Sequence, residues 1–222
     1  MQLTKLYIDA QCVVVLVLVS AIPAFGGIVS FTPPVTLIPA PADARFNSVL
    51  ESNTVAPLFV EMTGRTLTAP LTVDFNTPGT FNSNPVGALP VIAAGTIVDS
   101  YYLVTDPVGA DPNNNRNFAG SITFDVPVLG LIVLDPEFAS SNAAVGHTGT
   151  QYSTSGVGFE LGGGELVALS ADRRTVRFNA TSAPAADDIR IITAAEAPEP
   201  ASIALFASGL AVLGLIRRRR QA

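Results

Sequence analysis

The chain has 222 residues, which is enough for one domain with a buried core once a segment at each end is set aside. Only 14% of the residues are charged, and a lightly charged chain rich in Gly, Pro, Thr, Ser and Asn favours short strands over helices. Residues 27–197 contain 16 acidic residues against seven Arg and no Lys, a net charge of −9, which argues against nucleic-acid binding. The single cysteine, Cys12, lies in an N-terminal apolar run, which excludes disulfides and thiolate metal sites elsewhere.

Residues 1–26 have the pattern of a secretory signal peptide. Lys5 lies in a short polar start, and an apolar core of fewer than about 15 residues follows it. Ala24 and Gly26 then supply small residues at the −3 and −1 positions of a cleavage site. We therefore expect a signal helix that is removed after Gly26. A buried N-terminal helix is the alternative.

The middle of the chain, residues 27–195, predicts one all-β domain. Residues 27–90 indicate an irregular, proline-rich part with short strands, and residues 91–195 indicate the core of an antiparallel β-sandwich or jelly roll. Apolar and alternating runs predict strands over 58–61, 71–75, 96–104, 121–126, 130–134, 156–161, 165–170, 175–179 and 189–193. Residues 172–174 predict a hairpin turn, and a helix is expected at most near residues 43–52.

An asparagine-rich loop is the best candidate for a ligand site. Side chains with oxygen atoms occupy every second position of this loop, at Asp111, Asn113, Asn115 and Asn117. Together they could coordinate one Ca²⁺. The loop does not match an EF-hand, because Arg116 stands where the turn glycine belongs. A solvated loop is the alternative, since Asn and Asp are ordinary turn residues. No cofactor other than calcium is expected.

Catalytic machinery is not expected. His147 is the only histidine, so a Ser/His/Asp site would depend on it, with a nucleophile from among Ser140, Ser141 and Ser153. No Gly-x-Ser-x-Gly elbow supports such a site. A carboxylate pair for glycoside hydrolysis stays open, but the chain has no Trp to serve as a sugar platform. Residues 162–164, three glycines, and the pair Asp187-Asp188 are interpreted as turns.

Residues 196–222 form a three-part signal. The prolines of Pro198-Glu199-Pro200 hold this segment extended, because each fixes φ and disfavours helix in the residue before it. The uncharged apolar run 201–216 predicts a single transmembrane helix of roughly 24 Å at 1.5 Å per residue. Four basic residues follow the apolar run: Arg217, Arg218, Arg219 and Arg220. They should stop transfer of the chain through the membrane and stay on the cytoplasmic side. The preceding domain would then lie across the inner membrane.

These three parts, in this order, resemble the PEP-CTERM sorting signal. The resemblance implies that a membrane-embedded exosortase cuts near Pro198-Glu199-Pro200 and releases or transfers the protein. It also implies a Gram-negative bacterium that makes extracellular polysaccharide or a biofilm matrix. An ordinary tail anchor is the alternative. More weakly, residues 169–179 and 185–193 resemble the closing strands of β-sandwich domains found in PEP-CTERM proteins.

Two functions of different classes follow as hypotheses. The first is a structural or matrix protein that is anchored transiently in the inner membrane, reaches the surface or medium, and associates with exopolysaccharide. The second is a lectin-like, carbohydrate-binding module, assisted by calcium if the loop at Asp111 binds it. An enzyme is not expected.

Overall fold

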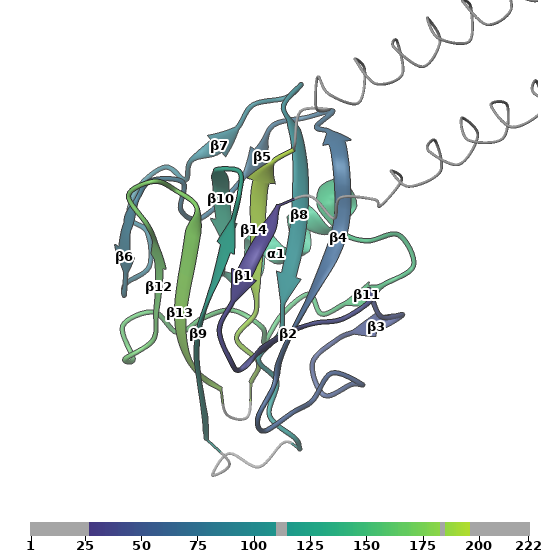
Figure 1. Ribbon diagram of the computed structural model, residues 1–222, viewed down its shortest axis with the longest axis vertical. Helices are drawn as coiled ribbons and strands as arrows, with labels where there is room; N and C mark the ends of the chain where they lie inside the picture. Colours follow the sequence, from purple (N-terminus) through teal and green to yellow (C-terminus); the bar gives the residue numbers. More distant parts are fainter. Residues whose placement is uncertain (1–26, 110–114, 183–184, 196–222) are drawn as a thin grey trace, which may run out of the picture.

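The computed structural model of the protein describes residues 27–109, 115–182 and 185–195. Two five-stranded sheets face each other, and a helix with shorter strands covers the second of them (Figure 1). The strand order is β1-β9-β13-β12-β6 in the first sheet, here sheet A, and β10-β14-β8-β4-β2 in the second, sheet B. The elements in chain order are β1 (Ile28–Phe31), β2 (Val35–Leu37), β3 (Asp43–Ala44), β4 (Ala56–Thr66), β5 (Leu71–Thr72), β6 (Gly79–Phe81), β7 (Val91–Ile92), β8 (Ile97–Leu103), β9 (Arg116–Phe124), β10 (Val128–Ile132), α1 (Asp135–Val145), β11 (Gln151–Tyr152), β12 (Leu166–Leu169), β13 (Thr175–Ser182) and β14 (Ile189–Ala194).

Strand pairing in both large sheets is antiparallel except at one edge, where β2 runs parallel to β4. Two small sheets, β3 with β11 and β5 with β7, complete the described strands. The all-β prediction is confirmed in its coarse form, because the described residues are mostly β-sheet with one short helix.

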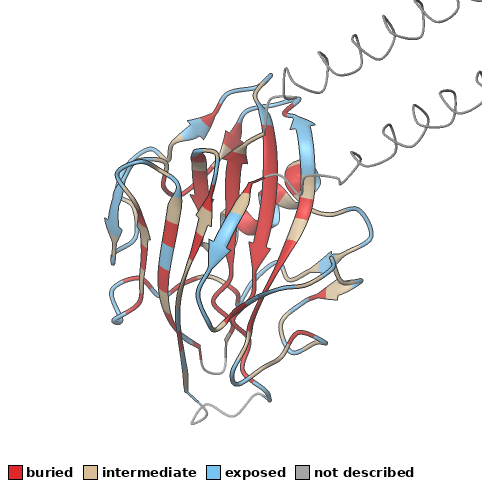
Figure 2. Ribbon diagram, viewed as in Figure 1, coloured by how far each residue is buried: buried red, intermediate tan, exposed pale blue. Residues whose placement is uncertain are grey.

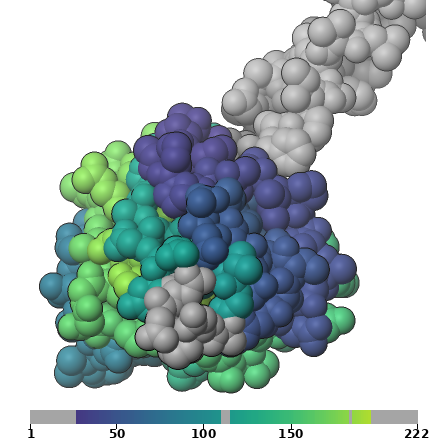
Figure 3. Space-filling model, turned by 90° about the horizontal axis from the view of Figure 1, so that it is seen from below, coloured from purple at the N-terminus to yellow at the C-terminus, as the bar shows by residue number. Residues whose placement is uncertain are grey.

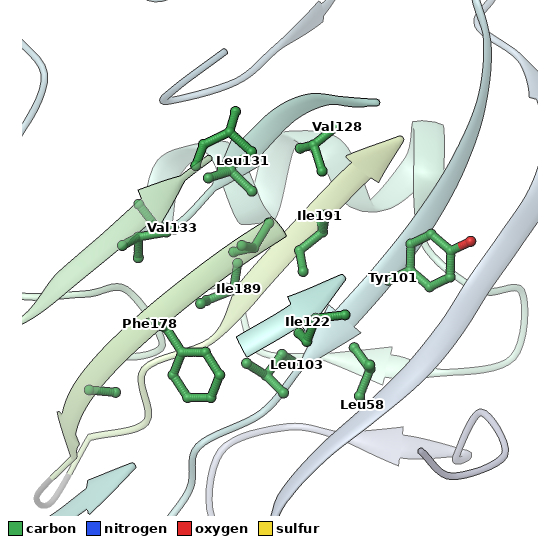
Figure 4. Packing of buried hydrophobic residues seen from close by; sticks show 14 of the residues in the cluster. Leu58, Tyr101, Leu103, Ile122, Val128, Leu131, Val133, Phe178, Ile189 and Ile191 are labelled. Atoms are coloured by element: carbon green, nitrogen blue, oxygen red, sulfur yellow. The ribbon is translucent and has the colours of Figure 1, made fainter. Parts of the chain in front are cut away.

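The main hydrophobic core lies between the two sheets. Side chains alternate across a strand, so on β13 the residues Val176 and Phe178 are buried while Arg177 is exposed (Figure 2). Figure 4 shows Phe178 and Ile122 of sheet A close to Leu103 of sheet B. Apolar burial between these faces is the main favourable term for the fold.

A second core lies on the other face of sheet B. Phe59 and Tyr102, from the central strands β4 and β8, pack there with Phe138 and Val145 of α1. Sheet B is therefore the middle layer of the molecule and is buried on both faces, whereas the outer face of sheet A meets solvent (Figure 2).

Several predictions about individual elements are wrong. No helix forms near residues 43–52, where β3 and turns lie instead, and the helix of the described residues is α1. The apolar run 156–161 forms no strand, and only its last residue, Leu161, makes an isolated bridge, to Glu165. The part 27–90 holds β4, the longest strand, which pairs with β8 inside sheet B.

The predicted signal helix (1–26) and transmembrane helix (201–216) lie outside the described residues. Within residues 27–109, 115–182 and 185–195, no helix is long and apolar enough to cross a membrane.

Arg190 of β14 is fully buried between sheet B and α1. Its Nε and one Nη2 hydrogen donate to the Glu61 carboxylate of β4, both at 2.8 Å. The other three N–H groups donate to acceptors on α1. These acceptors are the main-chain oxygen of Phe138, the hydroxyl of Ser141 and the side-chain oxygen of Asn142. All five guanidinium donors therefore have acceptors.

Aromatic rings complete the surroundings of Arg190. The guanidinium carbon lies 5.0 Å from the ring centre of Tyr102 and 5.2 Å from that of Tyr152. Burial by itself lowers the pKa of Arg190, but the charge and hydrogen bonds of Glu61 outweigh it, so the pKa lies above its ordinary value. Arg190 therefore stays charged and attaches α1 to sheet B.

We predict that Arg190→Met lowers the free energy of unfolding by about 3–5 kcal/mol, because it leaves Glu61 buried without a partner charge. Urea unfolding measures this, and Arg190→Met with Glu61→Met should recover part of the loss. Arg45→Met, which breaks the exposed ion pair with Asp43, is the control and should change little. A double variant no more stable than the single one would contradict this account.

Asp74 joins the segment after β5 to the start of α1. Its Oδ2 accepts hydrogen bonds from the main-chain N–H of Val133 at 2.7 Å and of Leu134 at 2.9 Å. Burial raises the pKa of Asp74 to about 6, the two N–H donors oppose this rise, and the charge of Glu137 adds to it. The folded protein thus holds this proton more tightly than the unfolded chain does.

We predict that the stabilisation from the Asp74 proton is fully present below pH 3.8 and is lost as the pH rises to about 6. The free energy of unfolding of the wild type, minus that of Asp74→Asn, should therefore fall over this window and level off above it. Urea titrations at a series of pH values measure the difference. A difference that stays constant with pH would show that Asp74 does not titrate in this way.

Candidate functional site

Three carboxylates converge at one end of the two sheets: Glu160, Glu165 and Asp187. The first two flank the three glycines of residues 162–164. Gly162 and Gly164 have φ values of 111° and 105°, which favour glycine, and the turn is closed by a hydrogen bond from Gly163 N–H to the Glu160 oxygen at 3.0 Å. The chain therefore doubles back and brings the two glutamates together just before β12 begins.

Glu165 is held by main-chain donors. Its Oε2 accepts the N–H of Glu160 at 2.7 Å, and its Oε1 accepts the N–H of Thr181 on β13 at 2.9 Å. The residue is only 3% exposed. These two bonds fix the carboxylate and link the glycine turn to sheet A.

Asp187 is fully buried in the segment that leads into β14. Its Oδ2 accepts the hydroxyl of Ser182 at 2.6 Å, while its Oδ1 has no hydrogen-bond partner among the described residues. Thr105 supports the arrangement, because its hydroxyl bonds to Ser182 at 3.0 Å and donates to the main-chain oxygen of Asp187.

The site is electrostatically strained. Burial raises the pKa of Asp187 to about 9, against the opposing effect of the Ser182 hydroxyl, and the negative charges of Glu165 and Glu160 raise it further. Burial and the charge of Glu165 also raise the pKa of Glu160. One carboxylate oxygen from each of the three side chains lies within 4.8 Å of the other two. Chemically, such a group can share a proton or hold a hard, oxygen-seeking cation.

Two hollows lie near these strands. One, of about 360 Å³, is lined in part by Glu160, Asp135 and Asn84, and so adjoins the carboxylate cluster. The other, of about 460 Å³, lies over β6, β12 and β13 and includes Thr80, Ser170 and Arg177.

The predicted calcium loop is only partly within the described residues, because Asp111 and Asn113 lie outside them. Asn115 is exposed, and Asn117, at the start of β9, donates its side-chain amide to the Asn179 oxygen at 2.9 Å. Calcium binding by this loop stays a prediction.

The start of β9 nevertheless lies at the same end of sheet A as the carboxylate cluster. Asn117 pairs with Thr181, whose N–H binds Glu165, and Arg116 pairs with Ser182. Figure 3 views the molecule from this end, where segments from the early, middle and late parts of the chain meet.

His147 does not join any of the serines considered as nucleophiles. Its Nδ1 lies 2.9 Å from the Thr150 hydroxyl, and its N–H donates to the Tyr152 hydroxyl at 2.8 Å. In the described part of the chain, no hydrogen bond links His147 to Ser140, Ser141 or Ser153. The hydroxyls of Ser140 and Ser141 donate to the α1 backbone, and that of Ser141 also accepts from Arg190. The hydroxyl of Ser153 accepts the main-chain N–H of Phe46. That the protein is not an enzyme stays a prediction.

Sequence reasoning missed the carboxylate cluster. Both of its segments were interpreted as turns, and the glutamates on either side of the three glycines were the available signal. Asp187 could not be added from sequence, because it lies 22 positions after Glu165 and the packing of the two sheets brings the two residues together.

Comparison with known proteins identifies the other end of the chain. A family model described as the PEP-CTERM protein-sorting motif matches residues 196–220, which include Pro198-Glu199-Pro200 and the four arginines after the apolar run. No curated protein and no solved structure matches the chain. The motif lies outside the described residues and does not reach the β domain. The chain therefore carries a PEP-CTERM sorting motif, which implies an exported, membrane-transiting protein that an exosortase processes.

Proposed function

We propose that this protein is a structural component of an extracellular polysaccharide matrix. Residues 1–26 direct export, residues 201–216 anchor the chain in the inner membrane, and an exosortase cuts near Pro198-Glu199-Pro200. The domain then reaches the cell surface or the medium. The match to the sorting motif carries this proposal, and the form of the β domain supports it.

The outer face of sheet A is the surface best suited to a hydrated polymer. Its residues form a polar layer: Thr175 and Thr123 bond to each other at 3.1 Å, and Asn179 bonds to Asn117. Arg177 lies between these two pairs and is exposed. Such side chains can exchange bonds with water for bonds with sugar hydroxyls at little net cost.

A lectin-like module is the second candidate. The hollow of about 460 Å³ favours it, because Thr80, Ser170 and Arg177 offer polar groups beside the apolar side chain of Ala168. A compact hollow suits a defined oligosaccharide, whereas the polar face suits a polymer without a fixed sequence.

We predict that the secreted protein lacks the segment after about Pro198 when it is expressed in a host that has an exosortase. Replacing Pro198, Glu199 and Pro200 by Ala should leave the full chain in the membrane fraction, because the tripeptide that the exosortase would recognise is lost. Intact-mass analysis of both fractions measures this. Glu196→Ala, a carboxylate outside the tripeptide, is the control and should be cut normally. Secretion of the triple variant with the same mass as the wild type would contradict the processing site.

We predict that the secreted protein sediments with extracellular polysaccharide from its own host. The double variant Arg177→Ala/Asn179→Ala should bind roughly three- to tenfold more weakly, since two hydrogen-bonding groups are removed. Arg65→Ala, an exposed arginine on β4, is the matched control and should bind as the wild type does.

A glycan array run with and without EDTA separates the two candidates. Selective binding to one oligosaccharide would favour the lectin, while polysaccharide binding without such selectivity supports the matrix role. If the protein is not retained by the polysaccharide, the matrix proposal fails.

A further inference from the structure

We propose that Glu160, Glu165 and Asp187 bind a divalent cation, and that Ca²⁺ is the ion that fits this set of ligands. The inference rests on the geometry of the three carboxylates and does not depend on the proposed matrix role. It is also separate from the calcium loop predicted at residues 111–117.

The spacing of the oxygen atoms fits one shared ion. Ca²⁺ lies about 2.3–2.6 Å from its oxygen ligands, so two oxygens on the same ion are at most about 5 Å apart. One carboxylate oxygen from each of Glu160, Glu165 and Asp187 lies within 4.8 Å of the other two. A single ion can therefore contact all three side chains.

An unsatisfied atom points to a missing partner. Asp187 has no solvent exposure, and within residues 27–109, 115–182 and 185–195 its Oδ1 has no hydrogen-bond donor. A buried polar atom without a partner is costly, and more so when it carries charge. The nearest charges acting on Asp187 are those of Glu165 and Glu160, which are also negative. A bound cation would satisfy Oδ1 and offset the repulsion.

In the described part of the chain, no basic group fills this position. The two ion pairs found in the described residues are Arg45 with Asp43 and Arg190 with Glu61, and neither involves the cluster. Arg116 is paired with Ser182 by strand register, but its guanidinium donates to the Asn115 main-chain oxygen at 3.3 Å.

The ligands are already positioned. Two main-chain N–H groups hold Glu165, and Ser182 holds Asp187 through Oδ2, which leaves Oδ1 free for the ion. Glu160 is exposed and lines the hollow of about 360 Å³, so an ion and its remaining waters can reach the site from that side. Little ordering would be needed on binding.

The chemistry of the ligands selects the ion. Carboxylate and water oxygens suit Ca²⁺ or Mg²⁺ and offer neither the nitrogen nor the sulfur that zinc sites commonly use. Ca²⁺ tolerates irregular geometry, whereas Mg²⁺ demands a near-ideal octahedron. Calcium sites in extracellular modules work at about 10⁻⁴–10⁻³ M, a range that an exported protein meets outside the cell.

Calcium titration of the EDTA-treated, full-length protein in detergent at neutral pH tests this site. Calorimetry should show a site with a Kd of about 10⁻⁴–10⁻³ M, and the melting temperature should rise with added CaCl₂. Glu160→Gln, at an exposed position, should fold normally and weaken binding about tenfold. Asp187→Asn should abolish binding at this site, and if it fails to fold, Glu160→Gln still decides the matter.

Two control variants separate this site from other carboxylates. Asp111→Asn probes the loop predicted from sequence, and Glu137→Gln alters an acid of α1; neither should change the affinity. Three results would overturn the proposal: no calcium binding at about 10 mM, well above the range of extracellular modules; loss of binding in Asp111→Asn; or unchanged affinity in Glu160→Gln. The first would mean that the carboxylates share a proton only. None of these results bears on polysaccharide binding by the Arg177 face.

Discussion

The fully buried guanidinium of Arg190 is the contact on which the arrangement of layers depends. It projects from β14 within sheet B, binds Glu61 on β4, and uses its remaining donors on α1. A charge in this position is tolerable only when every donor is matched. Because α1 is thereby attached to one face of sheet B, that sheet becomes the inner layer. The outer face of sheet A is left open to solvent.

In the carboxylate cluster, a buried ionisable group again needs a partner, but the described residues supply no basic side chain for it. Arg190 and Glu61 neutralise each other, whereas Asp187 is buried beside two further acids. The domain is acidic overall, with a net charge of −9 over residues 27–197, so it has few cations of its own to spare. This excess of acidic over basic residues is consistent with the proposal that the cluster takes its cation from the medium. The exported location and the ligand chemistry are consistent with each other on this point.

The sequence predicts features that depend on neighbouring residues, such as strands and the sorting motif. It does not predict features that depend on contacts between distant segments. The later strands, such as β8 and β13, coincide with apolar and alternating runs, because alternation reports which side of a strand is buried. The sorting motif is contiguous and was recognised in full. Helix α1 was missed because it buries Phe138, Ser141 and Val145, a narrow and partly polar stripe, and is secured by Arg190. The carboxylate cluster was missed because the sheets bring its members together.

The central claim is that the buried Asp187 carboxyl, whose Oδ1 has no hydrogen-bond partner in the described residues, is completed by an external ion shared with Glu160 and Glu165. A crystal structure of the secreted protein grown with calcium, with anomalous difference density measured at long wavelength, tests it most directly. The account predicts a peak about 2.3–2.6 Å from carboxylate oxygens of Glu160, Glu165 and Asp187. No peak at this position in crystals that hold calcium elsewhere, or a carboxylate–carboxylate contact closed by a proton, would contradict it.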